Sequence, residues 1–118
     1  MKLVISNNPL VKEYKTDIMY LDQGDYLDVL TKARDLIQKN YTLLTHPLSS
    51  NFLADKTFYK TVVLEEGENL NLQSIEIIEQ AIILVRESYS RRDPRIFDEE
   101  IKKDLQFIDY EIIKQALK

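Results

Sequence analysis

Cysteine is absent from the 118 residues of this chain, and its absence removes several classes of chemistry together. Disulfide bonds, thiolate metal sites, iron–sulfur clusters and cysteine nucleophiles all need a side chain that the protein does not have. Histidine occurs once, which leaves too few nitrogen ligands for a typical zinc site. We therefore expect no cofactor and no redox chemistry carried by this chain itself.

Long hydrophobic runs are also missing. The longest apolar run, Ala81 to Val85, is far shorter than the roughly 20 residues that cross a bilayer. The apolar stretch at the N-terminus, Leu3-Val4-Ile5, is too short for the core of a secretory signal. Both observations predict a cytoplasmic protein with no membrane contact.

Glycine and proline are scarce, at two and three residues, while 44% of the chain is hydrophobic and 31% is charged. This composition is typical of an ordered globular protein, and 118 residues suffice for one core but hardly for two. We therefore predict a single domain over residues 1–118. The net charge of −4 argues against binding to nucleic acid, because phosphate backbones attract basic surfaces.

Short apolar, β-branched runs alternate with amphipathic segments in the first half of the chain. Strands are predicted at residues 2–6, 17–21 and 42–45, with helices over 9–15 and 25–40 between them. Crossovers of about ten or more residues favour parallel pairing and place helices on both faces of the sheet. We expect an α/β fold: a three-layer, doubly wound, Rossmann-like sheet of about four mainly parallel strands in the order 2-1-3-4.

The second half of the chain adds one strand and two helices. A strand is predicted at residues 60–65, and its direction stays open because either sense can follow the preceding loop. Apolar residues at spacings of three and four predict a helix over 72–89. Asp93 and Pro94 suit the start of a C-terminal helix that stays amphipathic to its end. Such a helix can dock onto its own sheet or onto a second copy, so a homodimer is a possible assembly.

Polar side chains follow the first and third predicted strands. Asn7 and Asn8 follow the first, while Thr45, His46, Ser49 and Ser50 follow the third. Ligands of open parallel sheets bind beyond the carboxyl ends of the strands, where the strand order reverses. In the expected order, these two loops are neighbours and face one crevice. The sequence therefore predicts a candidate ligand site made of these six residues.

His46 has two interpretations within that crevice. As an enzyme residue it would act as a general acid or base on Ser49, Ser50 or a bound substrate, with Asn7 or Asn8 as an oxyanion donor. The simpler interpretation, which we favour, is that the imidazole caps the strand end by bonding to backbone. The chain contains none of the GxGxxG, GxxxxGK[ST], HExxH or GxSxG motifs that would point to a known catalytic class.

Aromatic residues are concentrated in the middle of the chain and suggest a surface for a partner protein. An alternative is that these rings fold back onto the edge of the sheet, which we favour in the absence of other signals. The residues concerned are Tyr20, Tyr26, Tyr41, Phe52, Phe58 and Tyr59.

Four segments of the chain resemble the GrdX family, small proteins encoded beside the glycine, sarcosine and betaine reductase systems of amino-acid-fermenting anaerobes. The segments are Leu3–Val11, Tyr26–Leu30, Leu43–Ser50 and Thr57–Thr61, of which the run Thr45-His46-Pro47-Leu48 is the most specific. The resemblance implies an accessory role near selenium- and thiol-dependent reductases in anaerobic amino-acid metabolism. Since the reductases' own chemistry needs cysteine and selenocysteine, a chain without cysteine fits a binding, assembly or regulatory factor better than a redox subunit.

The resulting functional prediction is an accessory protein that binds a small molecule or a partner protein. The partners implied are components of the glycine, sarcosine or betaine reductases, or a small anionic ligand. The alternative is a small enzyme that uses His46 as an acid or base in the strand-end crevice.

Overall fold

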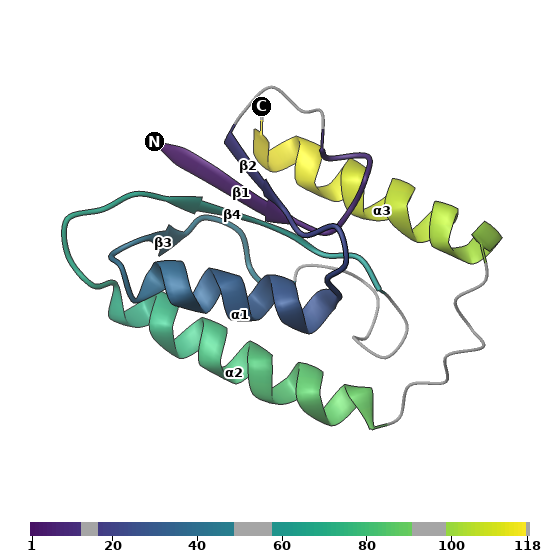
Figure 1. The fold of residues 1–118 in the computed structure, drawn as a ribbon. Helices are drawn as coiled ribbons and strands as arrows, with labels where there is room; N and C mark the ends of the chain where they lie inside the picture. Colours follow the sequence, from purple (N-terminus) through teal and green to yellow (C-terminus); the bar gives the residue numbers. More distant parts are fainter. Residues whose placement is uncertain (13–16, 49–57, 91–98, 118) are drawn as a thin grey trace.

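The computed structural model describes residues 1–12, 17–48, 58–90 and 99–117, which form a four-stranded sheet and three helices (Figure 1). In chain order, the elements are β1 (Lys2–Ser6), β2 (Asp17–Tyr20), α1 (Tyr26–Ile37), β3 (Thr42–Leu43), β4 (Thr61–Glu65), α2 (Leu72–Tyr89) and α3 (Glu99–Leu117). The α/β class and the sequence positions of all four strands agree with the predictions, and β1 and α2 have the predicted bounds.

The sheet is mixed, and its strand order is β2-β1-β4-β3. Among the strands of the described residues, only β1 and β2 pair in parallel, whereas β4 is antiparallel to both β1 and β3. The predictions of a mainly parallel sheet and of the order 2-1-3-4 are therefore wrong. Burial explains the observed order: Thr61 to Leu64 are all buried, whereas both residues of β3 are only partly buried. The more apolar strand takes the central position, and the two-residue strand takes the edge.

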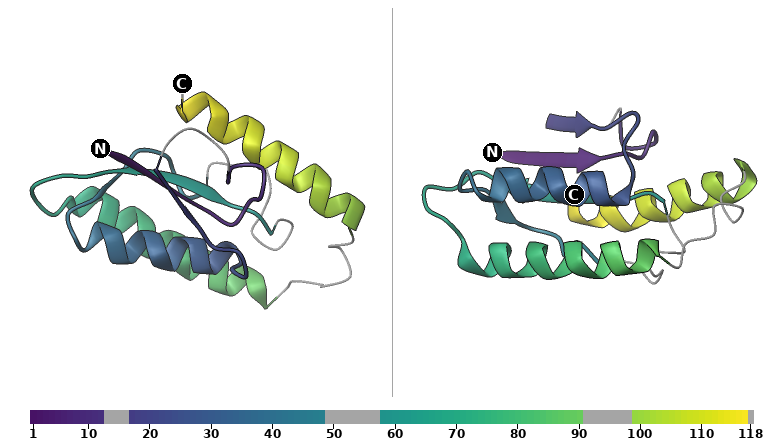
Figure 2. Two further views of the ribbon diagram at one scale, coloured as in Figure 1. Left: turned by 45° about the horizontal axis from the view of Figure 1, so that its top comes forward. Right: turned by 60° about the horizontal axis from the view of Figure 1, so that its bottom comes forward.

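Residues on the two faces of the central strands alternate in sequence, and each face meets different helices. Ile5, Val62 and Leu64 belong to a core cluster with α1 and α2, and Val4 and Val63 to a second cluster with α3. The helix residues of the first cluster are Tyr26, Val29, Leu30, Ala33, Ile37, Ile78, Ala81, Ile82 and Val85. Figure 2 shows α1 and α2 on one side of the sheet and α3 on the other, which confirms helices on both faces.

The start of α1 is held by local and tertiary hydrogen bonds. Asp25 and Asp28 form a capping box, in which each side chain accepts a hydrogen bond from the other's backbone N–H at 3.0 and 2.9 Å. The backbone N–H of Leu27 donates to the hydroxyl of Tyr89 at 2.9 Å, which joins the end of α2 to the start of α1. The first turn of α1 is therefore fixed beside the polar turn that precedes it.

Two predicted elements extend beyond the described residues. Residues 9–12 form a hydrogen-bonded turn in which Lys12 N–H donates to the Pro9 carbonyl at 3.3 Å, and the rest of the predicted helix over 9–15 lies outside the described part. The predicted start of the last helix at Asp93 and Pro94 also lies outside it. No helix within the described ranges has the length and apolar character needed to cross a membrane.

The C-terminal helix α3 docks onto its own sheet. Ile113 is buried against Val4 and Val63, and Tyr110 packs beside it. Ile101, Phe107 and Ile112 of the same helix are exposed. The predicted contact in cis is present, and a homodimer through this helix stays a prediction.

Candidate functional site

The parallel strands β1 and β2 end beside each other, and the polar residues that follow β1 are buried there. Asn7 is 3% exposed and Asn8 is fully buried. Leaving a buried amide without a hydrogen-bond partner lowers the stability of the fold by about 1–3 kcal/mol. The partners of these two side chains therefore show how this end of the sheet is held together.

Asn8 belongs to a buried polar network that joins the sheet to α3. Its side-chain amide donates to the backbone carbonyl of Gln106 at 2.8 Å and to the carboxylate of Asp109 at 2.9 Å. Thr61 donates its hydroxyl hydrogen to the same carboxylate oxygen at 2.7 Å, and the Ser6 hydroxyl lies 2.7 Å from Thr61. The network therefore holds α3 against the end of β1 by directional contacts as well as by apolar packing.

Asn7 joins three segments that are far apart in sequence. Its amide donates to the carbonyls of Gly24 at 3.2 Å and Phe58 at 3.0 Å, and its side-chain oxygen accepts from the Lys60 backbone N–H at 2.9 Å. These bonds tie the turn after β2 and the residues before β4 to the end of β1. Asn7 is thus the structural base of the surface above it.

A pocket of about 310 Å³ lies above that base, and we call it the strand-end pocket. Its lining residues come from the ends of β1 and β2, the segment before β4, and α3. They are Asn7, Pro9, Tyr20, Asp22, Gln23, Gly24, Phe58, Tyr59 and Lys102. This volume is at the small end of the roughly 300–1,000 Å³ that ligand pockets occupy, so the pocket suits a small molecule.

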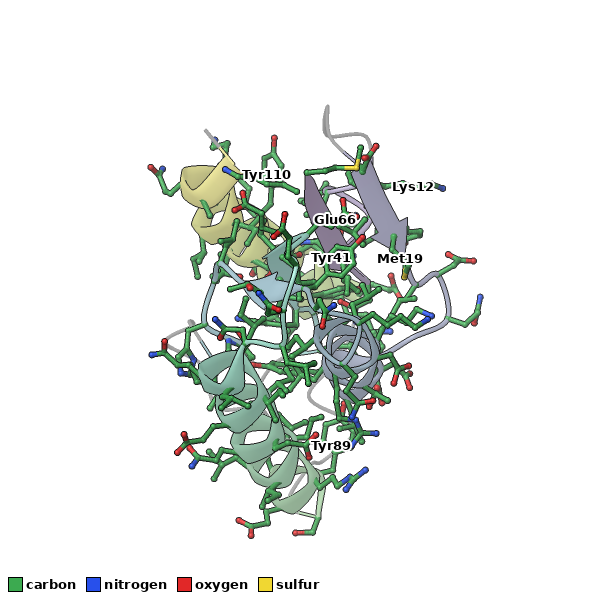
Figure 3. All side chains as sticks on the ribbon, turned by 90° about the vertical axis from the view of Figure 1, so that its left-hand side faces the viewer. Lys12, Met19, Tyr41, Glu66, Tyr89 and Tyr110 are labelled. Carbon is green, nitrogen blue, oxygen red and sulfur yellow. The ribbon has the colours of Figure 1, made fainter. Side chains whose placement is uncertain are left out.

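Aromatic rings form much of the pocket wall. Phe58 and Tyr59 pack edge to face with ring centroids 5.2 Å apart, and Tyr59 is only 8% exposed. The ammonium of Lys102 lies 5.7 Å from the Phe58 ring centroid, and that of Lys12 lies 5.2 Å from the Tyr20 ring centroid. Figure 3 places Lys12 beside the β2 edge of the sheet. Two rings of the pocket therefore already attract ammonium groups.

Burial dominates the pKa shifts at this end of the sheet. Burial raises the pKa of Tyr20, and the nearby Asp22 and Tyr59 raise it further, so the Tyr20 hydroxyl keeps its proton. Burial lowers the pKa of the Lys60 amine to about 8, although the Asp109 carboxylate acts in the opposite direction. Burial also raises the pKa of Asp109, against hydrogen bonds from Asn8 and Thr61 and the charge of Lys60. The internal charges thus carry a desolvation cost that their contacts only partly offset.

A family model described as GrdX-like protein matches residues 3–118 of this sequence, essentially the whole chain. The chain belongs to the GrdX-like protein family. Neither a curated protein nor a solved structure matches it. The family resemblance found in the sequence is therefore confirmed.

The only histidine of the GrdX-like chain lies away from the strand-end pocket. His46 is exposed, and its Nδ1 accepts a hydrogen bond from the Leu48 backbone N–H at 3.0 Å, as expected of a turn-capping residue. The following carbonyl, that of Pro47, accepts from the Tyr26 hydroxyl at 2.8 Å. The imidazole thus has a local structural role, as the simpler interpretation of the sequence expects.

Thr45 and His46 line a separate hollow of about 230 Å³ between β3 and the start of α2. The Thr45 hydroxyl oxygen there accepts from the Val63 backbone N–H at 3.0 Å. Among the described residues, Thr45 and His46 therefore line a different hollow from Asn7, because β4 lies between β1 and β3. Ser49 and Ser50 lie outside the described residues, and ligand binding by any of the six predicted residues stays a prediction.

Sequence reasoning missed the charged residues of the site in this GrdX-like chain. Asp22 looks like an ordinary turn residue, and Lys102 looks like a solvated helix residue. Asp109 did leave a signal, because it stands four residues from Leu105 and from Ile113, within the apolar row of α3. An acidic residue in such a row marks a buried polar contact whose partners lie elsewhere in the chain.

Proposed function

We propose that this GrdX-like protein is a cytoplasmic, non-catalytic accessory protein of glycine, sarcosine or betaine reductase systems. In this role it binds a small molecule in the strand-end pocket. The association with reductases rests on the family, and the binding role rests on the pocket. The absence of cysteine supports an accessory role, since the reductases' redox chemistry needs cysteine and selenocysteine.

One observation carries the binding role: four separate segments converge on one concave surface whose base is already hydrogen-bonded. Asn7 makes three hydrogen bonds to other segments, so the pocket does not need a ligand to hold its shape. A preformed site loses less conformational entropy when a ligand binds. Tyr20, Asp22 and Lys102 then offer the ligand a hydroxyl and two charged groups at the pocket wall.

The enzyme alternative would use the His46 hollow, and the geometry there supports it less. One ring nitrogen of His46 is engaged by Leu48, and a general base needs a partner that orients it toward a reacting group. Within the described residues, the lining of that hollow contains no acidic or basic side chain besides His46. The hollow therefore lacks the acid–base partners that a catalytic centre needs.

A ligand screen with two matched variants tests the proposal. Thermal shift and calorimetry would be run with glycine, sarcosine, betaine, phosphate and acetyl phosphate. We expect at least one of these to bind the wild type, and Tyr20→Ala to weaken that binding at least tenfold, because the ring and hydroxyl of Tyr20 form part of the pocket wall. His46→Ala should bind as the wild type does.

Two results would contradict the proposal. One is that no member of the panel binds the folded wild-type protein. The other is that His46→Ala abolishes binding while Tyr20→Ala, shown to be folded by its circular dichroism, keeps it. The second result would move the site to the hollow between β3 and α2.

A further inference from the structure

We infer that the ligand of the strand-end pocket is a small zwitterion, with a methylated or protonated amine within a few bonds of a carboxylate. This inference rests on the proposed function, since it names the ligand class of the same pocket. It follows from three features of the pocket wall: its opposite charges, its aromatic rings and its size.

The pocket wall carries one acidic and one basic side chain on different elements. Asp22 stands in the turn after β2, and Lys102 stands in the first turn of α3. Asp22 and Tyr20 line the same pocket, and the Asp22 carboxylate helps to raise the pKa of Tyr20. The ammonium of Lys102 lies 5.7 Å from the Phe58 ring centroid. A ligand in the pocket therefore meets one carboxylate and one ammonium group on its wall.

The aromatic rings favour an ammonium group that carries methyl groups. The ring faces of Tyr20 and Phe58 already hold the ammonium groups of Lys12 and Lys102 at 5.2 and 5.7 Å from the centroids. Cations are attracted to such faces by the ring quadrupole, and quaternary ammonium ligands use the same contact. The amine of the ligand would lie against Tyr20 near Asp22, in place of Lys12, which can turn into solvent from its exposed position.

A ligand with a single charge fits less well. An isolated anion would pair with Lys102 but lie near the Asp22 carboxylate, and an isolated cation would have the reverse arrangement. The volume of about 310 Å³ also restricts the ligand to a compact molecule, so the two charges must be close together. Only a small zwitterion satisfies both charged groups at once.

A series of three isosteric probes tests this directly by calorimetry at low salt. Betaine carries both charges, 3,3-dimethylbutanoate has the same shape without the positive charge, and choline keeps the trimethylammonium without the carboxylate. We expect betaine to bind at least tenfold more tightly than either analogue. Asp22→Asn should remove the preference over dimethylbutanoate, and Lys102→Gln the preference over choline. Asp104→Asn and Lys103→Gln, exposed on the same helix as Lys102, are the matched controls and should change neither.

The outcomes separate this inference from the function on which it rests. If dimethylbutanoate or choline binds as tightly as betaine and Tyr20→Ala weakens that binding, the pocket is a binding site but not one for zwitterions. If betaine binds best and neither Asp22→Asn nor Lys102→Gln alters the preference, the assigned charges are wrong. If none of the three probes and none of the wider panel binds, both proposals fail.

Discussion

Replacing Asn8 by alanine should lower the free energy of unfolding by about 3 kcal/mol, because it removes three partly buried hydrogen bonds, each worth about 1 kcal/mol. The lost contacts are those to the Gln106 carbonyl, the Asp109 carboxylate and the Leu10 backbone N–H. The Asp109 carboxyl is already desolvated, so losing a donor there is especially costly. Urea denaturation followed by circular dichroism at pH 7 measures the change.

Asn69→Ala is the matched control for this variant, since Asn69 is exposed in the loop before α2. Its effect should stay within about 0.5 kcal/mol. Hydrogen exchange should also show faster opening of α3 in Asn8→Ala than in the control, because Asn8 bonds to two residues of that helix. A loss below about 1 kcal/mol with unchanged exchange in α3 would mean that the network contributes little to stability.

Replacing Lys60 by methionine should have the opposite sign and raise the free energy of unfolding at pH 7 by about 2 kcal/mol. Lys60 is 3% exposed, and its pKa of about 8 shows that burial outweighs the attraction to Asp109. Methionine keeps the apolar stem and removes the charge, although it gives up the contact with the Tyr26 ring at 6.0 Å and the electrostatic attraction to Asp109.

The pH dependence of the wild type provides a second test of the same residue. A lysine whose folded pKa lies below its unfolded value binds fewer protons in the folded state between those two values. Stability should therefore rise with pH from about 8 toward 9.5, and this rise should be smaller in Lys60→Met. Lys103→Met, exposed on α3, should keep the rise. A less stable Lys60→Met with an unchanged pH profile would show that the charge of Lys60 stabilises the fold.

Elements with strong local signals could be predicted from the sequence. The apolar period over residues 72–89 predicted both ends of α2. The structure adds the cap Asn71, whose side chain accepts from the Ser74 backbone N–H. The apolar run Leu3-Val4-Ile5 predicted β1 with its observed bounds. The order of the sheet could not be predicted in the same way, because it depends on which strand is buried on both faces. The fully apolar Val62-Val63-Leu64 is the feature that puts β4 beside β1.

The site was predictable only in part, for a related reason. The sequence pointed to the end of β1, and Asn7 does form the base of the strand-end pocket. It also singled out the aromatic residues, of which Tyr20, Phe58 and Tyr59 line that pocket. Lys102 joins them only because α3 is anchored across the sheet end, through contacts between residues about a hundred positions apart. A sequence pattern within one segment cannot predict a contact between segments so far apart in the chain.

The central claim is that a small molecule binds in the strand-end pocket, and amide NMR tests it most directly. Uniformly ¹⁵N-labelled protein would be titrated with betaine while the backbone amide shifts are followed. We predict saturable shifts at Gly24, Phe58 and Tyr59, and none at Leu43 or Ser74 in the hollow beside His46. Shifts confined to Leu43 and Ser74, or no saturable shift anywhere with betaine or with the other members of the panel, would contradict the account.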